Sequence, residues 1–251
     1  MLKTRIITAI VLLAILLPVL FSHSYLAFAT LALVFYACAA WENQRLFGSK
    51  QAVLVAAIWS ALFAYLLWQN QFAKSGFLFG LCVGIWLLRL SPNLALGLPA
   101  LGTLGNRLLG NIYSVAILGC FVAIVTLFQH SPAYLLSSMA LVWIADIGAY
   151  FSGRRFGKRK LAVTISPGKS WEGAIGGAIA VVVLSVLAIV CAPQATWLQD
   201  TFVLALQQHW GWPVSIILLL CISAASVVGD LIESQLKRRI GMKDSSGLLP
   251  G

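Results

Sequence analysis

Asp146-Ile-Gly-Ala-Tyr-Phe-Ser-Gly-Arg-Arg-Phe-Gly-Lys-Arg-Lys160 is the stretch from which the fold of this chain is best worked out. It starts with a carboxylate inside an apolar run and ends with five basic residues in seven positions. A second carboxylate, Glu172, stands where the next apolar run begins. Because an ionisable residue inside a membrane span is costly and usually functional, the stretch predicts a site at the end of a span.

The composition indicates an integral membrane protein. Of the 251 residues, 61% are hydrophobic and 10% are charged, and the mean hydropathy is +0.94, which is too apolar for a soluble domain. The net charge of +10 lies between apolar runs, so it indicates membrane topology and anionic partners rather than nucleic acid. The five cysteines lie singly in apolar runs, which argues against disulfides or a zinc site.

Apolar runs long enough to cross a bilayer recur along the whole chain. We expect an all-α, polytopic membrane protein with one domain, 1–251, in which early spans occupy 1–130 and the motif-bearing spans occupy 133–251. The first run also follows the pattern of a signal peptide. About eight spans are predicted: 6–21, 25–41, 52–68, 76–90, 110–128, 133–152, 173–192 and 213–229.

Basic residues give the orientation, because Lys and Arg of short loops stay on the cytoplasmic side. With eight spans and a cytoplasmic N-terminus, all of the 17 Lys and Arg residues except Lys74 fall on that side. The pattern predicts that both termini as written are cytoplasmic. It also places the basic loop after Asp146 at the cytoplasmic face.

The two most telling acidic residues are Asp146 and Asp230, which are predicted to lie at similar depth on two spans. Tyr150 and Gly153 follow Asp146 at i+4 and i+7 and share its helix face, and Gly153 and Gly157 would let a ligand approach the backbone. Paired carboxylates suit a hard divalent cation and a phosphate substrate. A lone aspartate hydrogen-bonded to a neighbouring span remains the alternative for Asp146.

Asp230 begins a charged helix face that continues with Glu233 and Lys237, at i+3 and i+7. This face also fits a plain salt-bridge set at a helix end. The segment 166–173 reads Ser-Pro-Gly-Lys-Ser-Trp-Glu-Gly and opens a helix, where free N–H groups can hold phosphate. It does not match a Walker loop, because Val163 replaces the first glycine.

At these residues the chain resembles phosphatidate cytidylyltransferase, also called CDP-diacylglycerol synthase. Three motifs carry the resemblance: Asp146-x-x-Ala-Tyr-x-x-Gly-x-x-Phe-Gly157, Ser166-Pro-x-Lys-Ser-x-Glu-Gly173 and Ser234-x-Leu-Lys-Arg-x4-Lys-Asp-Ser-x-x-x-Leu-Pro-Gly251. The last is the diagnostic one. The early spans are similar in character only.

The resemblance implies transfer of the cytidylyl group of CTP to phosphatidate with magnesium, at the inner face of a bacterial cytoplasmic membrane. A second cation and a homodimer are compatible with it. It implies catalytic roles for Asp230, Lys237, Asp146 and Glu172, with Asp230 and Asp146 as metal ligands. The implied nucleotide site comprises Ser166, Lys169, Ser170, Lys237, Arg238, Lys243 and Asp244.

One departure from the family pattern concerns the end of the chain. In the family, Leu-Pro-Gly runs on into a further acidic segment and a last span, whereas this chain stops at Gly251. If the second metal-binding aspartate belongs to that segment, we expect the polypeptide as written to be inactive. A fragment, a frameshift and a real terminus are equally compatible with the sequence.

Two other functions remain open. A secondary transporter would also use several spans and buried acids, although no inverted repeat is visible. A CTP-dependent polyprenol kinase is closer in chemistry. The CDP-alcohol phosphotransferases are excluded, because their D-G-x-x-A-R signature is absent.

Overall fold

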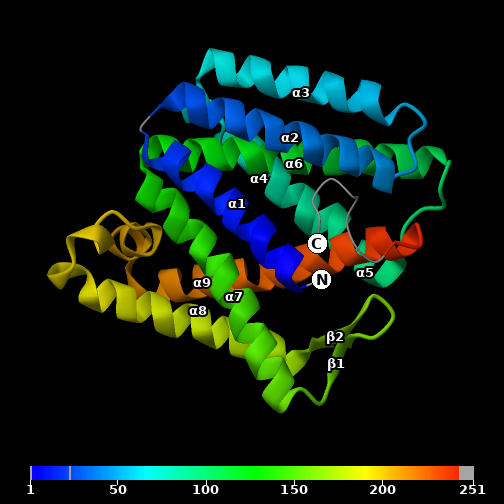
Figure 1. Ribbon diagram of the computed structural model, residues 1–251. Coiled ribbons are helices and arrows are strands. Elements are labelled where there is room, and N and C mark those ends of the chain that lie inside the picture. The colour runs from blue at the N-terminus through cyan, green and yellow to red at the C-terminus, as the bar shows by residue number, and fades with distance from the viewer. Residues whose placement is uncertain (1, 23, 243–251) are drawn as a thin grey trace. The chain divides into compact units, whose positions relative to one another are not determined.

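The computed structural model describes residues 2–22 and 24–242 (Figure 1). Its longer helices are α1 (Leu2–Phe21), α2 (Tyr25–Leu46), α3 (Ala52–Gln69), α4 (Gly76–Ile85), α6 (Leu104–His130), α7 (Pro132–Phe156), α8 (Trp171–Cys191) and α9 (Phe202–Arg239). Shorter elements are η1 (Phe72–Lys74), the π-helical η2 (Trp86–Leu90), α5 (Asn93–Leu96), η3 (Ala192–Gln194) and η4 (Thr196–Leu198). The strands β1 (Lys160–Ala162) and β2 (Ser166–Ser170) form one antiparallel hairpin.

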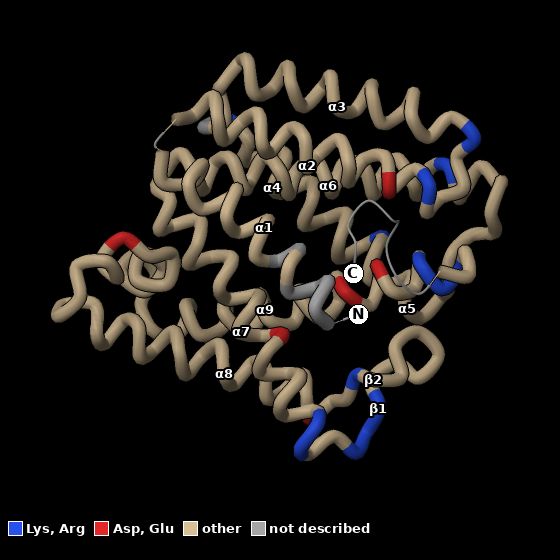
Figure 2. Tube along the Cα trace, in the orientation of Figure 1, with Lys and Arg blue, Asp and Glu red and all other residues tan. Residues whose placement is uncertain are grey.

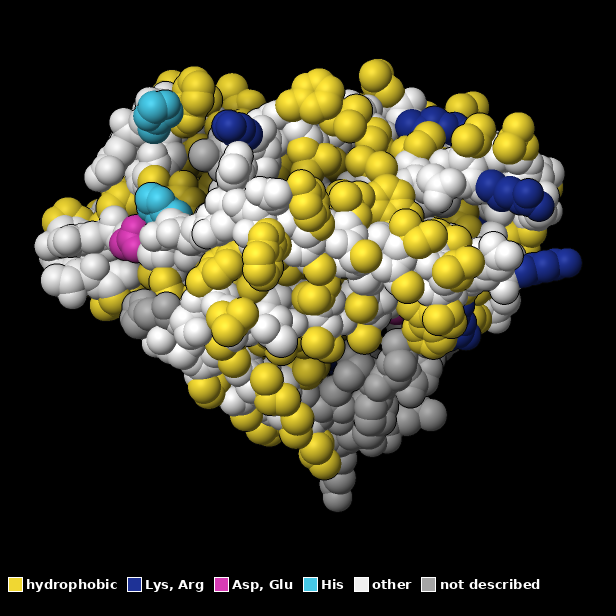
Figure 3. Space-filling model, turned by 90° about the horizontal axis from the view of Figure 1, so that it is seen from above, with side chains coloured by type: hydrophobic (Ala, Val, Ile, Leu, Met, Phe, Trp, Pro, Cys, Tyr) yellow, Lys and Arg dark blue, Asp and Glu magenta, His cyan; other side chains and the backbone are white. Residues whose placement is uncertain are grey.

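Seven helices in the described part of the chain are long and apolar enough to cross a membrane. The expected all-α polytopic fold is confirmed, and the predicted count of about eight is close. The difference lies in α1, for which only Ile10–Phe21 is recognised as an apolar helix. Hydrophobic side chains spread across the face drawn in Figure 3, as expected of a protein whose surface contacts lipid.

Two compact units make up the chain. The first contains Met1–Gln129 together with Leu236–Gly251, and the second contains His130–Gln235. The prediction of a single domain, 1–251, with early spans in 1–130 and motif-bearing spans in 133–251, stays a prediction.

In the first unit, α2 packs between α3 and α6. The rings of Tyr36, Phe63 and Phe121, one from each helix, meet with centroids 4.6 to 6.0 Å apart. Near one end of these helices Phe28 stacks on Phe128, whereas near the other end Asn43 donates hydrogen bonds to Ser114 Oγ at 2.7 Å and the carbonyl of Gly110 at 3.3 Å. These contacts make α2 antiparallel to both α3 and α6.

The end of α9 also belongs to the first unit. The Arg239 guanidinium donates to Asn106 Oδ1 at 2.8 Å, to the carbonyl of Leu46 at 3.0 Å and to that of Pro99 at 3.2 Å. It also stands 5.0 Å from the ring centroid of Phe47. The side chain therefore ties the α9 end to the start of α6 and the end of α2.

In the second unit, α7 and α8 pack backbone against backbone. A Cβ on Gly173 would lie 2.9 Å from the carbonyl oxygen of Ala149, and one on Gly177 would lie 2.5 Å from that of Ala145. Both separations are too short for any side chain. Small residues at such spacing let two helices approach closely within a membrane.

The predicted span 213–229 lies within α9, which begins earlier, at Phe202, and is interrupted at Gly211, where φ is 72°. Pro213 then lies in the first turn of the resumed helix, where proline is tolerated. The backbone N–H of Phe202 donates to Ser137 Oγ at 2.8 Å and ties the start of α9 to α7.

The close approach of α7 and α8 predicts an asymmetry between two Gly→Ala substitutions. Gly177→Ala forces its methyl group onto Ala145, and such overpacking destabilises by about 1–3 kcal/mol. Gly84→Ala on α4 is the matched control, because nothing lies within 4 Å of its new methyl group. In thermal unfolding of the detergent-purified protein, Gly177→Ala should lower Tm by several degrees and Gly84→Ala should not. Equal Tm values for the two variants would contradict the packing.

Candidate active site

A cavity of about 470 Å³ in the second unit is bordered by α7, β2, the start of α8 and α9. We call it the Asp146–Asp230 pocket. It brings together five of the residues predicted from sequence. The lining comprises Asp146, Ala149, Tyr150, Gly153, Arg154, Leu161, Ser166, Gly168, Lys169, Ser170, Gly173, Ala174, Val227 and Asp230.

One face of α7 supplies the first wall. Asp146, Tyr150 and Gly153 all line the pocket, which confirms that they share a helix face as their i, i+4, i+7 spacing predicted. Tyr150 OH accepts a hydrogen bond of 3.5 Å from Arg154 Nη1. The adjoining face of α7, with Ala145 and Ala149, contacts the glycines of α8.

The second wall comes from α9. Ser226 Oγ donates to Asp146 Oδ1 at 3.4 Å, so the suspected hydrogen bond between Asp146 and another span exists. Asp230 is one helical turn beyond Ser226, and side chains at i and i+4 are about 5–6 Å apart at Cβ. The two aspartates therefore border one small space.

Lys169 forms an ion pair with Asp230 across the pocket. The lysine side chain is 25% exposed and the aspartate 53%, so the pair lies at the mouth rather than in the core. The sequence had suggested Lys237 as a helix-end partner. The pocket instead combines two carboxylates with one ammonium group that can be drawn to a bound phosphate.

The β1–β2 hairpin delivers Lys169 and Ser166 to the pocket. Its register pairs Lys160 with Ser170 and Ala162 with Ser166. Ser170 Oγ then accepts from Gly173 N at 3.2 Å and caps α8, since an N-cap serine satisfies a free N–H of the first turn. This hydroxyl is therefore engaged in the fold, and nucleotide binding by Ser170 stays a prediction.

Glu172 does not line the pocket. Its carboxylate accepts from the backbone N–H groups of Lys158 and Arg159, both at 3.1 Å, and from Arg159 Nε at 3.2 Å. The carboxylate thus fastens the chain that leaves α7 to the first turn of α8. A catalytic role for Glu172 remains a prediction, whereas its contacts indicate a positioning role.

Gly153 and Gly157 were expected to let a ligand approach the backbone. A Cβ on Gly157 would lie 2.7 Å from Ser170 Oγ, and one on Gly153 would lie 3.2 Å from the same atom. Both glycines therefore serve the packing of α7 against the start of α8. Only Gly153 also borders the pocket.

The carboxylates of the pocket suit a divalent cation that is also held by substrate. Within residues 2–22 and 24–242, no group of three or more His, Cys, Asp or Glu side chains could hold a metal alone. Mg²⁺, however, is usually held by one or two carboxylates together with substrate phosphates. Asp146 and Asp230 supply two carboxylates on one cavity, so the pocket fits a cation that arrives with a phosphate substrate.

The remaining predicted residues are not among those that line the pocket in the described part of the chain. Lys237 and Arg238 belong to the first unit, while Lys243 and Asp244 are outside the described residues. Figure 2 shows several Lys and Arg residues at the end of α7 and along the hairpin, as well as others elsewhere on the chain. Sequence reasoning missed Ser226, although its i−4 spacing from Asp230 is a usable signal.

The model of the Cytidylyltransferase family matches residues 3–251. Phosphatidate cytidylyltransferase of Haemophilus influenzae is 36% identical to the chain over 272 residues, covering 100% of the chain and 91% of that relative. The enzyme of the same name from Pseudomonas aeruginosa is 39% identical over 259 residues, covering 100% and 89%. The Brucella suis enzyme is 47% identical over 114 residues, which are 45% of the chain.

The contacts of Glu172 predict its effect on the basic loop. Glu172→Gln removes the negative charge that holds Lys158 and Arg159, so the loop should open more often. Trypsin should then cut after residues 158–160 several times faster, as measured by mass spectrometry of timed digests. Asp200→Asn, which neutralises an acid outside the hairpin, is the control and should leave the cleavage rate unchanged. Unaltered cleavage in Glu172→Gln would show that the carboxylate does not hold the loop.

Proposed function

Since the chain belongs to the Cytidylyltransferase family, we propose that it transfers the cytidylyl group of CTP to phosphatidate and forms CDP-diacylglycerol and pyrophosphate. The observation that carries the proposal is the Asp146–Asp230 pocket, in which two carboxylates and Lys169 meet at the ends of membrane-crossing helices. The two relatives matched over the full chain bear the name of this activity.

In the proposed reaction, a phosphate oxygen of phosphatidate attacks the α-phosphorus of CTP. One P–O bond forms, and the bond from the α-phosphorus to the oxygen that leads to the β-phosphorus breaks. The electron pair of that bond leaves with pyrophosphate. Little covalent chemistry is required of the protein, so positioning and charge stabilisation supply most of the acceleration.

Lys169 is the pocket's proposed phosphate-binding cation. In the structure its ammonium group is paired with Asp230, which keeps both charges satisfied without substrate. A triphosphate competes strongly for an ammonium group. Lys169 can therefore turn from Asp230 to a phosphate oxygen while it stays in the pocket. Arg154, on the same lining, adds a second positive charge.

Asp146 and Asp230 would hold Mg²⁺ when the nucleotide is present. A bound Mg²⁺ supplies positive charge that offsets the charge developing on the phosphates. Ser226 orients Asp146 through its hydrogen bond.

We place the pocket at the cytoplasmic face of a bacterial inner membrane. The distribution of Lys and Arg supports this orientation, and the full-length relatives are bacterial. Phosphatidate would enter from the inner leaflet and CTP from the cytoplasm. A homodimer is compatible with the proposal and is not required by it.

Substrate tests separate this function from its rivals. Membranes that carry the protein should convert radiolabelled CTP into a CDP-lipid when given phosphatidate and not when given a polyprenol, as read by thin-layer chromatography. Phosphorylated polyprenol would instead identify a CTP-dependent kinase. Failure with both lipids, alongside membranes of the Haemophilus influenzae relative that do form product, would contradict the proposed activity for this chain.

Neutralising Asp230 and neutralising Asp146 should affect activity in different ways. Asp230→Asn should lower turnover by about 100-fold or more, because it removes charge directed at the reacting phosphates, while the protein still inserts into membranes. Asp200→Asn should retain activity. Normal turnover by Asp230→Asn would remove this residue from the site.

Asp146→Asn should mainly affect the requirement for magnesium. With one carboxylate left, the Mg²⁺ concentration that gives half-maximal turnover should rise about tenfold or more, and excess Mg²⁺ should recover part of the activity. A magnesium titration at saturating CTP measures this shift. An unchanged magnesium requirement would show that Asp146 is not a ligand.

A further inference from the structure

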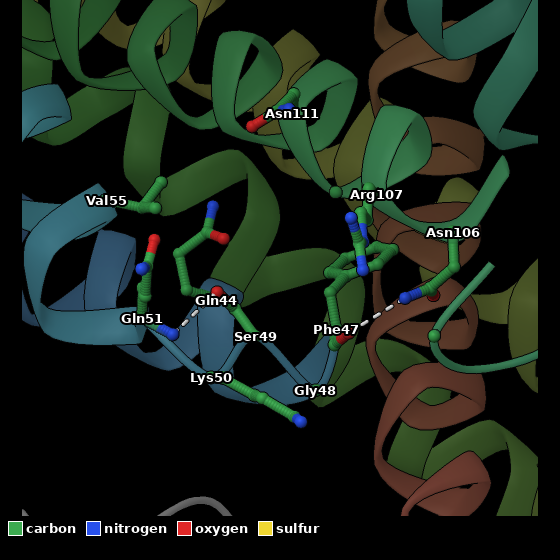
Figure 4. A pocket seen from close by; sticks show the side chains of 12 residues that line it. Gln44, Phe47, Gly48, Ser49, Lys50, Gln51, Val55, Asn106, Arg107 and Asn111 are labelled. Carbon is green, nitrogen blue, oxygen red and sulfur yellow. Dashed lines mark hydrogen bonds between the residues drawn. The ribbon is translucent and has the colours of Figure 1, made fainter. Parts of the chain in front are cut away.

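A second cavity of about 470 Å³ lies wholly in the first unit, where α2 ends and α3 and α6 begin. We call it the α2–α3–α6 pocket. Figure 4 shows Gln44, Gln51 and Val55 on one side of it and Phe47 and Arg107 on the other. None of its residues belongs to the proposed reaction.

The pocket is positively charged. Lys50 and Arg107 line it and are exposed, and its lining contains no acidic residue. Glu42, the acid nearest in sequence, is not part of the lining. The Arg239 guanidinium adds a third positive charge just behind the lining residues. It donates a hydrogen bond to Asn106 and lies over the ring of Phe47. Such a cluster of one sign attracts anions.

Helix ends strengthen the positive potential. Both α3, with 18 residues, and α6, with 27, begin at the pocket, and the N-terminus of a helix carries about half a positive charge. Gln51, the N-cap of α3, makes no side-chain capping bond. Its exposed amide is thus available to a ligand, as is that of Asn111.

The polar walls are held in place before any ligand binds. Gln44 Nε2 donates to Ser114 Oγ at 3.1 Å, and Asn106 Nδ2 donates to the carbonyl of Phe47 at 2.8 Å, as drawn in Figure 4. Gln44 and Asn106 are 6% and 1% exposed. A rigid wall lowers the entropy that binding would otherwise cost.

Exposed apolar side chains continue from the pocket along both helices. Val53 is 71% exposed and Leu54 56% on α3, while Leu104 is 71% and Leu108 54% exposed on α6. A small soluble anion would leave these apolar side chains uncovered. Hydrocarbon chains attached to an anionic headgroup would cover them.

We propose that the α2–α3–α6 pocket binds the phosphate headgroup of an anionic phospholipid, whose acyl chains lie along α3 and α6. Free phosphate shares the headgroup chemistry, so the test must separate the two sources. Phosphatidylglycerol is the suitable probe, because it is neither substrate nor product of the proposed reaction. The outcome is therefore independent of the proposed function.

Photocrosslinking can report on the pocket directly. Val55→p-benzoylphenylalanine places a crosslinker in the lining, and Val83→p-benzoylphenylalanine places one at an exposed apolar position of α4, outside the lining, as the matched control. The protein is reconstituted in phosphatidylcholine with increasing phosphatidylglycerol, and the crosslinked lipid is identified by intact mass. Crosslinking at residue 55 should select phosphatidylglycerol, whereas crosslinking at 83 should follow the bulk composition.

Charge removal tests the recognition. A basic residue near an anionic lipid contributes about 1 kcal/mol, so Lys50→Gln or Arg107→Gln should raise the half-saturating phosphatidylglycerol fraction about fivefold and the double variant about 30-fold. Lys74→Gln, which alters an exposed lysine of the same unit outside the pocket, should change nothing. No lipid selectivity at residue 55, or full selectivity in the double variant, would overturn the proposal. Loss of crosslinking when inorganic phosphate is added at the lipid's own concentration would assign the pocket to soluble phosphate and overturn it too.

Discussion

The contact of α7 with α8 through bare backbone is the constraint on which the second unit depends. Helices in lipid gain no hydrophobic energy from each other, so they need close packing to associate. Gly173 and Gly177 allow this, because the carbonyl oxygens of Ala149 and Ala145 occupy the space that side chains would take. This contact between α7 and α8 fixes the rotation of α7 about its own axis. The face that adjoins it, with Asp146 and Tyr150, must then border the Asp146–Asp230 pocket.

The same contact between α7 and α8 explains how the β1–β2 hairpin completes the Asp146–Asp230 pocket. Because α7 and α8 are close where one ends and the other begins, the chain between them must turn within a short distance. Glu172 meets the backbone of Lys158 and Arg159 at that turn, and Ser170 caps α8. The hairpin is therefore fixed at both ends, and Lys169 is delivered to Asp230. The N-terminus of a helix carries a partial positive charge, which also stabilises an acidic residue in the first turn such as Glu172.

The part of this arrangement that follows helical periodicity was predictable from the sequence. The spacing of Asp146, Tyr150 and Gly153 gave their common face, and the apolar runs gave the spans. The partner of Asp230 was not predictable, because Lys237 is close in sequence whereas Lys169 reaches it only through the hairpin. The contacts of Glu172 were equally hidden, since they depend on how far the chain after α7 folds back. Spacing within one helix can be read from the sequence. Ion pairs between separate elements cannot, because they depend on how the chain folds back.

Charge balance connects the Asp146–Asp230 pocket to the proposed nucleotide substrate. The lining carries two aspartates against Lys169 and Arg154, so it is close to neutral before a ligand arrives. A nucleotide triphosphate adds several negative charges, and the two basic side chains cannot offset them all. In the proposed reaction, this deficit would favour uptake of a divalent cation with the nucleotide, at the aspartate that Lys169 would vacate. On that proposal the ion pair of Lys169 with Asp230 would do more than stabilise the fold, because it would keep the proposed metal position neutral until a phosphate drew the lysine away.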